Sequence, residues 1–243
     1  MTTQRPREPQ LAGEMFAAAE LAALMTDPLY YGVGAPRGDG RPAVVLPGMF
    51  ANDWYLRPLR TWLSRIGYRA VRSTLAMNVG CPQRLTEQVE AELGRHRRDG
   101  QPAILIGHSR GGMLARVIAV RLGRECSHLV LLGSPVGALT AASWWPEARD
   151  VAHSRVAAAG LRARERRDPD CNVPYCGCPY PADFKRPLAP STRVLSIYSR
   201  DDPVVPARAC RIAGATNIEV SGTHSGLVYN RAAYRALAEF LKQ

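Results

Sequence analysis

The chain has 243 residues, of which 46% are hydrophobic and only 7% aromatic, and it carries a formal net charge of +11. This length suits one domain, and the apolar content is enough to bury a sizeable core built mainly from aliphatic side chains. The positive charge is almost entirely arginine, is spread along the chain, and does not alternate with aromatic residues as it does in proteins that bind single-stranded nucleic acids. We therefore expect no nucleic-acid partner.

The N-terminal region lacks the features of a secretion signal. Its first ten residues are polar, and the apolar stretch 11–25 is interrupted by Glu14 and Glu20, whereas a signal peptide needs an uninterrupted apolar run and a cleavage site with small residues. No run approaches the roughly 18 apolar residues of a membrane span. We expect a cytoplasmic protein without an integral membrane segment, or a secreted one if a presequence has been removed.

Helix and strand patterns alternate along the chain. Residues 11–25 repeat apolar positions at helical spacing and predict a helix, which a Gly- and Pro-rich loop follows at 32–42. Short apolar runs predict strands buried on both faces of a parallel sheet, at 43–46, 68–71, 103–106, 128–132, 194–198 and 218–220. Other patterns predict helices at 53–65, capped by Asn52 or Asp53, and at 84–98, 113–122 and 227–241. This alternation predicts an α/β fold with a doubly wound, mainly parallel sheet.

One long segment interrupts the alternation. Residues 134–190 contain no strand pattern, two Trp residues and many Arg, Pro and Cys residues. We expect a single domain over 1–243, with 1–41 as an N-terminal helix and loop and 134–190 as a mainly helical cap inserted after the fourth strand. Because ligands of open α/β sheets bind at the carboxyl ends of the strands, the cap is expected to lie over those ends. Trp144 and Trp145 either contact an apolar substrate there or pack the cap onto the sheet.

A G-x-S-x-G motif carries the chemistry. Residues 107–111 read Gly-His-Ser-Arg-Gly and lie between a buried strand and a helix. This is the context of a nucleophile elbow, in which small neighbours permit a strained turn and the serine is exposed above the sheet. The dipole of the following helix favours negative charge that develops there. We predict that Ser109 is a nucleophile, and the alternative is a glycine-rich turn with an ordinary serine.

A serine hydroxyl needs a base, and the base needs an acid that orients it. Of the five His residues, only His224 follows the last predicted strand, and hydrolases with such an elbow have the order nucleophile, acid, histidine. We predict that His224 is the base. The acid should follow the strand 194–198, where Asp201 and Asp202 are adjacent. One would orient the imidazole and the other would be a turn residue or cap, and the residues alone do not choose between them.

These motifs resemble those of the α/β-hydrolase lipases and esterases, in particular small bacterial members that carry G-H-S-R-G-G at the elbow. The resemblance covers roughly residues 42–241. In that family the acid precedes a D-x-V-V-P-like stretch, which implies that Asp202 is the acid.

The resemblance also implies an oxyanion hole made of two backbone N–H groups. One belongs to Arg110, the residue after the nucleophile. The other belongs to Met49, in a loop that reads Pro-Gly where many family members have His-Gly, and Phe50 replaces Met49 if the loop is shifted by one residue.

Three of the six Cys residues, Cys171, Cys176 and Cys178, fall within eight residues. Their spacing differs from that of structural zinc sites, so no metal is expected. The resemblance implies Cys residues in the cap and near Cys210. We therefore expect at least one disulfide among these four, although the absence of a secretion signal favours reduced thiols. Sequence cannot choose the pairing.

The motifs and the resemblance together imply a carboxylic ester hydrolase that acts on a small-molecule ester through an acyl-enzyme and needs no cofactor. An acyltransferase that uses the same acyl-enzyme and a dry pocket is one alternative. A non-catalytic binding protein on the same fold is another. Neither the acyl-chain length nor the oligomeric state can be read from the residues.

Overall fold

The computed structural model describes residues 11–98, 100–137 and 177–242, and the side chains from residue 17 onward. Six strands form one sheet, all parallel, in the order β2-β1-β3-β4-β5-β6. They are β1 (Pro42–Leu46), β2 (Arg69–Arg72), β3 (Ala103–His108), β4 (Cys126–Leu132), β5 (Arg193–Ser199) and β6 (Thr216–Val220). The expected doubly wound parallel sheet is confirmed, and all six strands lie within two residues of the predicted runs.

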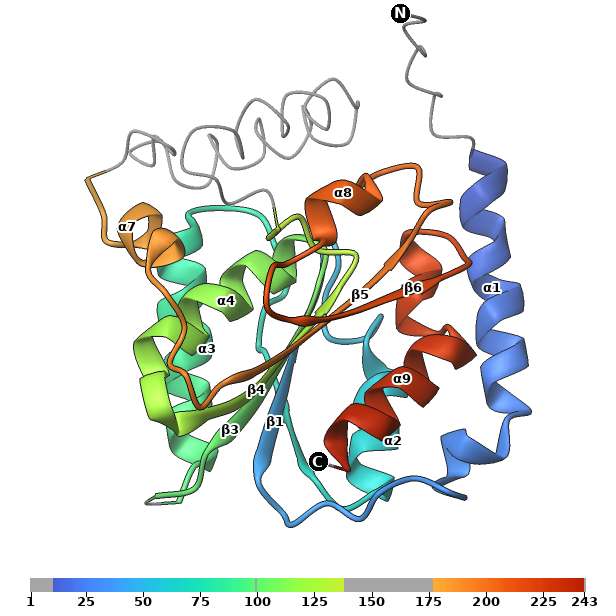
Figure 1. Cartoon of the computed structure of the whole chain (residues 1–243), viewed down its shortest axis with the longest axis horizontal. Helices are drawn as coiled ribbons and strands as arrows, with labels where there is room; N and C mark the ends of the chain where they lie inside the picture. The colour runs from blue at the N-terminus through green and yellow to red at the C-terminus, as the bar shows by residue number, and fades with distance from the viewer. Residues whose placement is uncertain (1–10, 99, 138–176, 243) are drawn as a thin grey trace, which may run out of the picture.

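Helices cover both faces of the sheet (Figure 1). One face packs against α1 (Leu11–Met25), α2 (Arg57–Arg65) and α9 (Arg231–Leu241). The other packs against α3 (Pro82–His96), α4 (Arg110–Leu122) and α7 (Tyr180–Lys185). Short elements complete the described chain: η1 (Pro28–Tyr31), η2 (Gly123–Glu125), α8 (Ala207–Cys210) and η3 (Ser225–Val228).

Alternating side chains of the central strands build the two cores. Ala43 and Val45 face the first core, whereas Val44 and Leu46 face the second, and all four are fully buried. Continuous apolar runs are therefore explained, because each side of the strand meets a helical layer. The carboxyl ends of all six strands lie at the same edge of the sheet, as the parallel pairing requires.

The helix predicted at 53–65 begins later than expected. It starts at Arg57, with Pro58 in its first turn, and Asp53 does not cap it. Instead Asp53 is buried and accepts hydrogen bonds from the backbone N–H groups of Ser73 and Thr74, each at 3.1 Å. It also accepts the Ser73 hydroxyl at 2.8 Å. Asp53 therefore binds the backbone of the loop after β2 and does not cap α2.

The helix predicted at 227–241 is two elements. Residues Ser225–Val228 form η3, and α9 begins only at Arg231. Asn230 separates them by accepting from the N–H groups of Ala232 and Ala233, at 2.9 and 3.1 Å, which makes it the N-cap. The apolar pattern continues through the break because η3 also buries its side chains in the core.

The predicted helix at 11–25 is present with the same bounds. Most of the expected cap, including Trp144, Trp145, Cys171 and Cys176, lies outside the described residues. Within the described part of the chain, no helix is both long enough and apolar enough to cross a membrane.

Candidate active site

The turn between β3 and α4 is strained at Ser109. This residue has φ 52° and ψ −125°, a combination that residues with a Cβ rarely adopt. Its backbone N–H donates to the carbonyl of Leu132 at 2.8 Å, which ties the turn to the end of β4. Ser109 is only half-buried. The predicted elbow therefore has the geometry that its motif implies.

Three glycines let this turn pack closely. A methyl group at Gly111 would lie 2.4 Å from the carbonyl oxygen of Leu46, at the end of β1. At Gly112 it would lie 2.0 Å from the hydroxyl of Ser134, and at Gly107 it would lie 2.4 Å from Gly112 itself. The start of α4 is thus seated directly on the ends of the neighbouring strands, and no larger residue fits.

His224 and Asp202 meet beside the elbow. The Nδ1 atom of His224 lies 2.6 Å from Oδ2 of Asp202, and their side chains are 8% and 1% exposed. Because an ionised carboxylate can only accept, His224 Nδ1 carries the proton and Nε2 is left as the basic nitrogen. The His224 ring also lies 4.8 Å, centroid to centroid, from the ring of His108, the residue before Ser109.

The two adjacent carboxylates have different surroundings. The second oxygen of Asp202, Oδ1, accepts the backbone N–H groups of Val204 and Val205, each at 2.8 Å. Asp201 is exposed, and its own N–H donates to the hydroxyl of Ser199 at 3.0 Å. Only Asp202 is therefore brought to His224.

Gly133 is a site residue that the sequence reasoning missed. It follows β4 directly and has φ 54°. A methyl group there would lie 2.8 Å from Leu227 Cδ1, 3.3 Å from Asp202 Oδ2 and 3.4 Å from His224 Nδ1. The side chains of Asp202 and His224 therefore pack directly against Gly133, where a larger residue would displace them. A glycine immediately after a buried strand, at the carboxyl edge of the sheet, was the available signal.

The loop after β1 lies against the elbow. A methyl group at Gly48 would lie 3.3 Å from Ser109 Cβ and 2.9 Å from His108 Nδ1, so this loop contacts the serine closely. Met49 is half-buried, and Phe50 has φ 63°. Arg110 is the first residue of α4, where the backbone N–H has no acceptor within the helix. Met49 and Arg110 therefore stand on the two segments that the predicted oxyanion hole requires.

A side-chain clamp joins these two segments. The guanidinium of Arg110 donates to the carbonyl of Asn78 at 2.9 Å and to its side-chain oxygen, and also to the carbonyl of Gly80 at 2.9 Å. Asn78 is fully buried and donates its amide to the carbonyl of Pro47 at 2.6 Å. Its backbone N–H donates to Ala51 at 3.2 Å. The loop 47–51 is thus held at both ends by Asn78, a residue with no recognisable sequence motif.

His108 is a neutral structural histidine. Burial, together with the nearby His224, lowers its pKa to about 3. Its Nε2–H donates to the backbone carbonyl of His224 at 2.9 Å, because that carbonyl can only accept. His108 therefore joins the elbow to the loop that carries His224.

Cys210 takes no part in the disulfide expected among Cys171, Cys176, Cys178 and Cys210, and two of these residues, Cys171 and Cys176, lie outside the described residues. The thiol of Cys210 is free and fully buried, and burial raises its pKa. Its carbonyl accepts the hydroxyl of Ser196 at 2.7 Å. The side chain behaves as a small core residue at the end of α8, which is the common role of a buried thiol.

Neither the comparison with protein-family models nor that with curated proteins gives a match to this sequence. Many solved structures share the fold. A superfamily hydrolase from Oenococcus oeni has a TM-score of 0.55 at 14% identity, over 84% of this chain and 92% of that one. A lipase from Bacillus licheniformis has a TM-score of 0.53 at 12% identity, over 85% and 94%. Polyneuridine aldehyde esterase has a TM-score of 0.53 at 13% identity, over 84% and 100%.

These neighbours are α/β hydrolases, and the likeness extends over nearly the whole length of each. The chain therefore has the α/β-hydrolase fold, as the resemblance of its motifs implies. At such low identity the likeness establishes the fold, and the activity has to be argued from the site itself.

Proposed function

We propose that this chain is a carboxylic ester hydrolase with Ser109 as nucleophile, His224 as base and Asp202 as the orienting acid. One observation carries the proposal. A strained serine on an elbow stands at the same edge of the sheet as a buried, hydrogen-bonded imidazole–carboxylate pair. Structural turns and core histidines do not need this combination, whereas acyl transfer to a serine does.

In the acylation step, Ser109 Oγ attacks the ester carbonyl while His224 Nε2 takes the hydroxyl proton. The carbonyl oxygen becomes an oxyanion that the N–H groups of Met49 and Arg110 stabilise. Asp202 stabilises the imidazolium that forms. When the tetrahedral intermediate collapses, the carbon–oxygen bond to the alcohol breaks and His224 protonates the departing alkoxide.

In the deacylation step, a water molecule replaces the alcohol. His224 removes a proton from the water as the water attacks the acyl carbonyl, and the same two N–H groups hold the second oxyanion. The bond to Ser109 Oγ then breaks, His224 returns the proton to the serine, and the carboxylic acid leaves. No step requires a metal ion or an organic cofactor.

Exposed apolar side chains beside the oxyanion loop favour an ester with an apolar part. Phe50, Trp54 and Met77 are 38%, 70% and 36% exposed, although large hydrophobic residues are usually covered. The hydrogen bond from Asn78 N–H to Ala51 holds the segments of Met77 and Phe50 next to each other. Burying these side chains under an acyl chain would contribute roughly 25 cal/mol for each Å² of apolar surface removed from water.

Two measurements test the proposal. The purified chain is treated with a fluorophosphonate probe, and hydrolysis is followed with p-nitrophenyl esters from acetate to palmitate. We expect labelling at Ser109 and hydrolysis that improves as the acyl chain becomes longer than acetyl. Ser109→Ala should abolish both while its circular dichroism stays that of the parent.

His224→Ala separates the proposed base from the other histidines. The control is His153→Ala, which changes a histidine of the expected cap segment 134–190. We expect the first change to lower kcat by several orders of magnitude, because the three residues act as a unit. Labelling that persists in Ser109→Ala would overturn the choice of nucleophile. A greater loss in His153→Ala than in His224→Ala would overturn the choice of base. Product esters formed in place of acid in dilute alcohol would assign the chain to the acyltransferases.

A further inference from the structure

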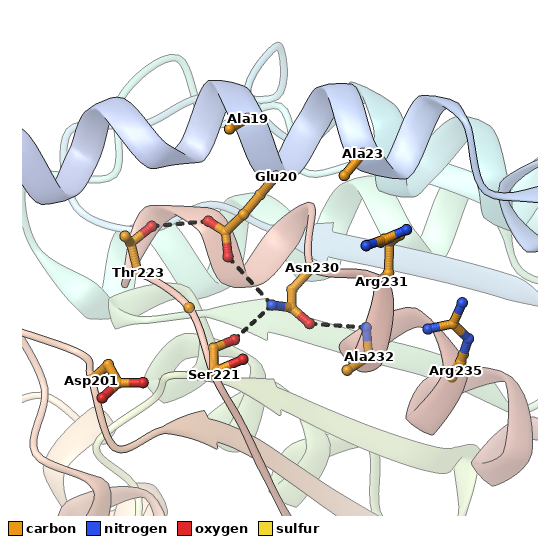
Figure 2. Close-up of a pocket in the computed structure, with 11 residues that line it drawn as sticks. Ala19, Glu20, Ala23, Asp201, Ser221, Thr223, Asn230, Arg231, Ala232 and Arg235 are labelled. Carbon is orange, nitrogen blue, oxygen red and sulfur yellow. Dashed lines mark hydrogen bonds between the residues drawn. The ribbon is translucent and has the colours of Figure 1, made fainter.

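The N-terminal helix α1 contacts the loop that carries His224. Glu20, on α1, points at this loop from the wall of a pocket of about 610 Å³ between α1 and the start of α9 (Figure 2). One oxygen of its carboxylate, Oε2, lies 3.1 Å from the hydroxyl of Thr223. The other, Oε1, lies 3.3 Å from the side-chain nitrogen of Asn230. A single carboxylate thus binds both ends of the segment 223–230.

The direction of the first hydrogen bond follows from the donors present. The Thr223 hydroxyl oxygen already accepts the backbone N–H of Gly226 at 3.0 Å. Its single hydrogen is therefore directed to Glu20, since a carboxylate only accepts. The bond between Thr223 and Gly226 closes the turn in which His224 lies. Glu20 therefore fixes this turn through its hydrogen bond with Thr223, the first residue of the turn.

Two glycines on either side of His224 provide the space for the carboxylate. A methyl group at Gly226 would lie 1.4 Å from Glu20 Oε2, and one at Gly222 would lie 2.3 Å from Oε1. Gly222 has φ 133°, which by itself favours glycine, whereas Gly226 is absent from the residues with positive φ. The backbone conformation of Gly226 therefore does not require glycine. The absence of a side chain at this position leaves the space that the Glu20 carboxylate occupies.

Asn230 extends the link to the rest of the loop. Besides contacting Glu20, its amide nitrogen donates to the carbonyl of Ser221 at 2.7 Å, while its oxygen caps α9 (Figure 2). The side chain of Asn230 therefore joins Ser221, at the start of the loop, to the first turn of α9 at its end. Glu20 ties this assembly to α1.

The opposite side of the loop is held by different elements. His108 donates to the carbonyl of His224, and the hydroxyl of Tyr55 donates to the carbonyl of Ser225. The turn around His224 is thus fixed from the elbow side by His108 and Tyr55. Glu20 fixes it from the side of α1.

We propose that Glu20 is a positioning residue for His224, a role that rests on the proposed ester hydrolysis. The imidazole must reach Ser109 in acylation and the incoming water in deacylation, and it must keep its bond to Asp202 throughout. A misplacement of about 1 Å can cost about a hundredfold in rate even when it arises away from the reacting atoms. The carboxylate of Glu20 acts by fixing the backbone on both sides of the base.

The test compares Glu20→Ala and Glu20→Gln with Asp201→Asn, which removes a carboxylate from the same pocket without touching Thr223 or Asn230. We expect Glu20→Ala to lower kcat for p-nitrophenyl esters about tenfold to a hundredfold, with KM within about twofold. Glu20→Gln keeps an acceptor for Thr223 but opposes one amide to another at Asn230, so it should lose less. Asp201→Asn should retain the parental kcat.

A spectroscopic readout separates positioning from general stability. The proton between His224 Nδ1 and Asp202, which lie 2.6 Å apart, should give a far-downfield ¹H NMR signal, and the loss of this signal in His224→Ala would assign it. We expect this signal to broaden or shift in Glu20→Ala and to stay in Asp201→Asn. Parental kcat and an unchanged signal in Glu20→Ala, with the fold intact by circular dichroism, would overturn the proposal.

If Glu20→Ala does not fold, Thr223→Val tests the same link, because valine keeps the shape of threonine and removes the hydroxyl. Where Glu20→Ala folds, it forms a double-mutant cycle with Thr223→Val: additive losses in kcat would overturn the link, whereas a smaller combined loss supports it. If the parent neither labels nor hydrolyses esters, the proposed function fails. The NMR signal of His224 still tests whether Glu20 positions the ring.

Discussion

The carboxylate of Asp202 divides its two oxygens between His224 and the backbone: Oδ2 lies 2.6 Å from His224 Nδ1, and Oδ1 accepts two N–H groups at 2.8 Å. The backbone bonds fix the orientation of the carboxyl plane. The carboxylate can therefore hold the ring of His224 in one tautomer, with Nε2 free to act as base.

Asp202→Asn should cripple catalysis while Asp201→Asn should not. The amide keeps the shape of the side chain but removes the charge and favours the wrong tautomer of His224. In a well-studied serine protease the same change costs about 10⁴ in kcat, and we expect a loss of that order here. Asp201 is exposed and does not contact His224, so its variant should stay within about twofold in kcat. A larger loss in Asp201→Asn would show that the acid was assigned one residue too late.

Gly133→Ala should damage the site by displacing Asp202 and His224, which pack against this glycine. The new methyl group would meet Leu227 at 2.8 Å and Asp202 Oδ2 at 3.3 Å. We expect a loss in kcat of about tenfold to a hundredfold from displacement of Asp202 and His224. Stability should fall by about 1–3 kcal/mol from overpacking and the positive φ, measured by urea unfolding.

Gly214→Ala is the matched control for that change. Gly214 has φ 75°, so alanine meets the same kind of backbone strain, but nothing lies within 4 Å of the added methyl group. We expect a loss of about 1 kcal/mol in stability and an unchanged kcat. If both variants keep full activity, Gly133 serves the fold and not the site.

Asn78→Asp should loosen the oxyanion loop. Aspartate keeps an acceptor for the guanidinium of Arg110 but cannot donate to the carbonyl of Pro47 as the amide does at 2.6 Å. One oxyanion donor contributes about 10² to 10³ in kcat, so a displaced Met49 N–H should cost a substantial part of that, about tenfold or more. KM should change little, because the donors act mainly in the transition state. An equal rise in KM with constant kcat would show that the loop binds the ground state.

The sequence predicted the sheet well, because each strand is a continuous apolar run covered on both faces. Helix ends were harder, since Asp53 and Asn230 satisfy loop and cap donors that no local pattern reveals. Ser109 and His224 were predicted from the motif and the chain order. Asp202 needed the family resemblance, because its preference over Asp201 depends on the direction of a side chain.

The supporting residues could not be read from the sequence. Asn78 lies 31 residues from Pro47, and Glu20 lies 203 residues from Thr223, and neither pair has a fixed spacing that a local pattern could expose. These contacts arise only when the crossovers bring distant loops to one edge of the sheet. Gly133 gave a weak signal by its position after a strand, but its contact with Asp202 and His224 is tertiary.

Two buried histidines should make the protein sensitive to mild acid. Burial lowers the pKa of His108 to about 3 and that of His128 to about 4, whereas the ordinary value is 6.5. The unfolded chain therefore binds more protons than the folded chain below pH 6.5, and the free energy of unfolding falls as the pH decreases toward 4. Above pH 6.5 both states hold these residues neutral, so their contribution is constant.

His128→Asn should reduce this acid sensitivity without touching the site. Asparagine places an oxygen near the position of Nδ1, which contacts the hydroxyl of Ser127 at 3.0 Å, and it does not titrate. If His128 took up a full proton only in the unfolded chain, its contribution to the free energy of unfolding would fall by about 2.7 kcal/mol over two pH units. Solvent screening at this ring reduces the expected fall between pH 6.5 and 4.5 to about 1 kcal/mol, and the variant should lack it. His96→Asn, which changes an exposed histidine paired with Glu92, is the control and should leave the urea midpoints of the parent unchanged at both pH values. If His128→Asn loses stability with acid as steeply as the parent, His128 is protonated in the folded chain and its burial does not oppose the charge.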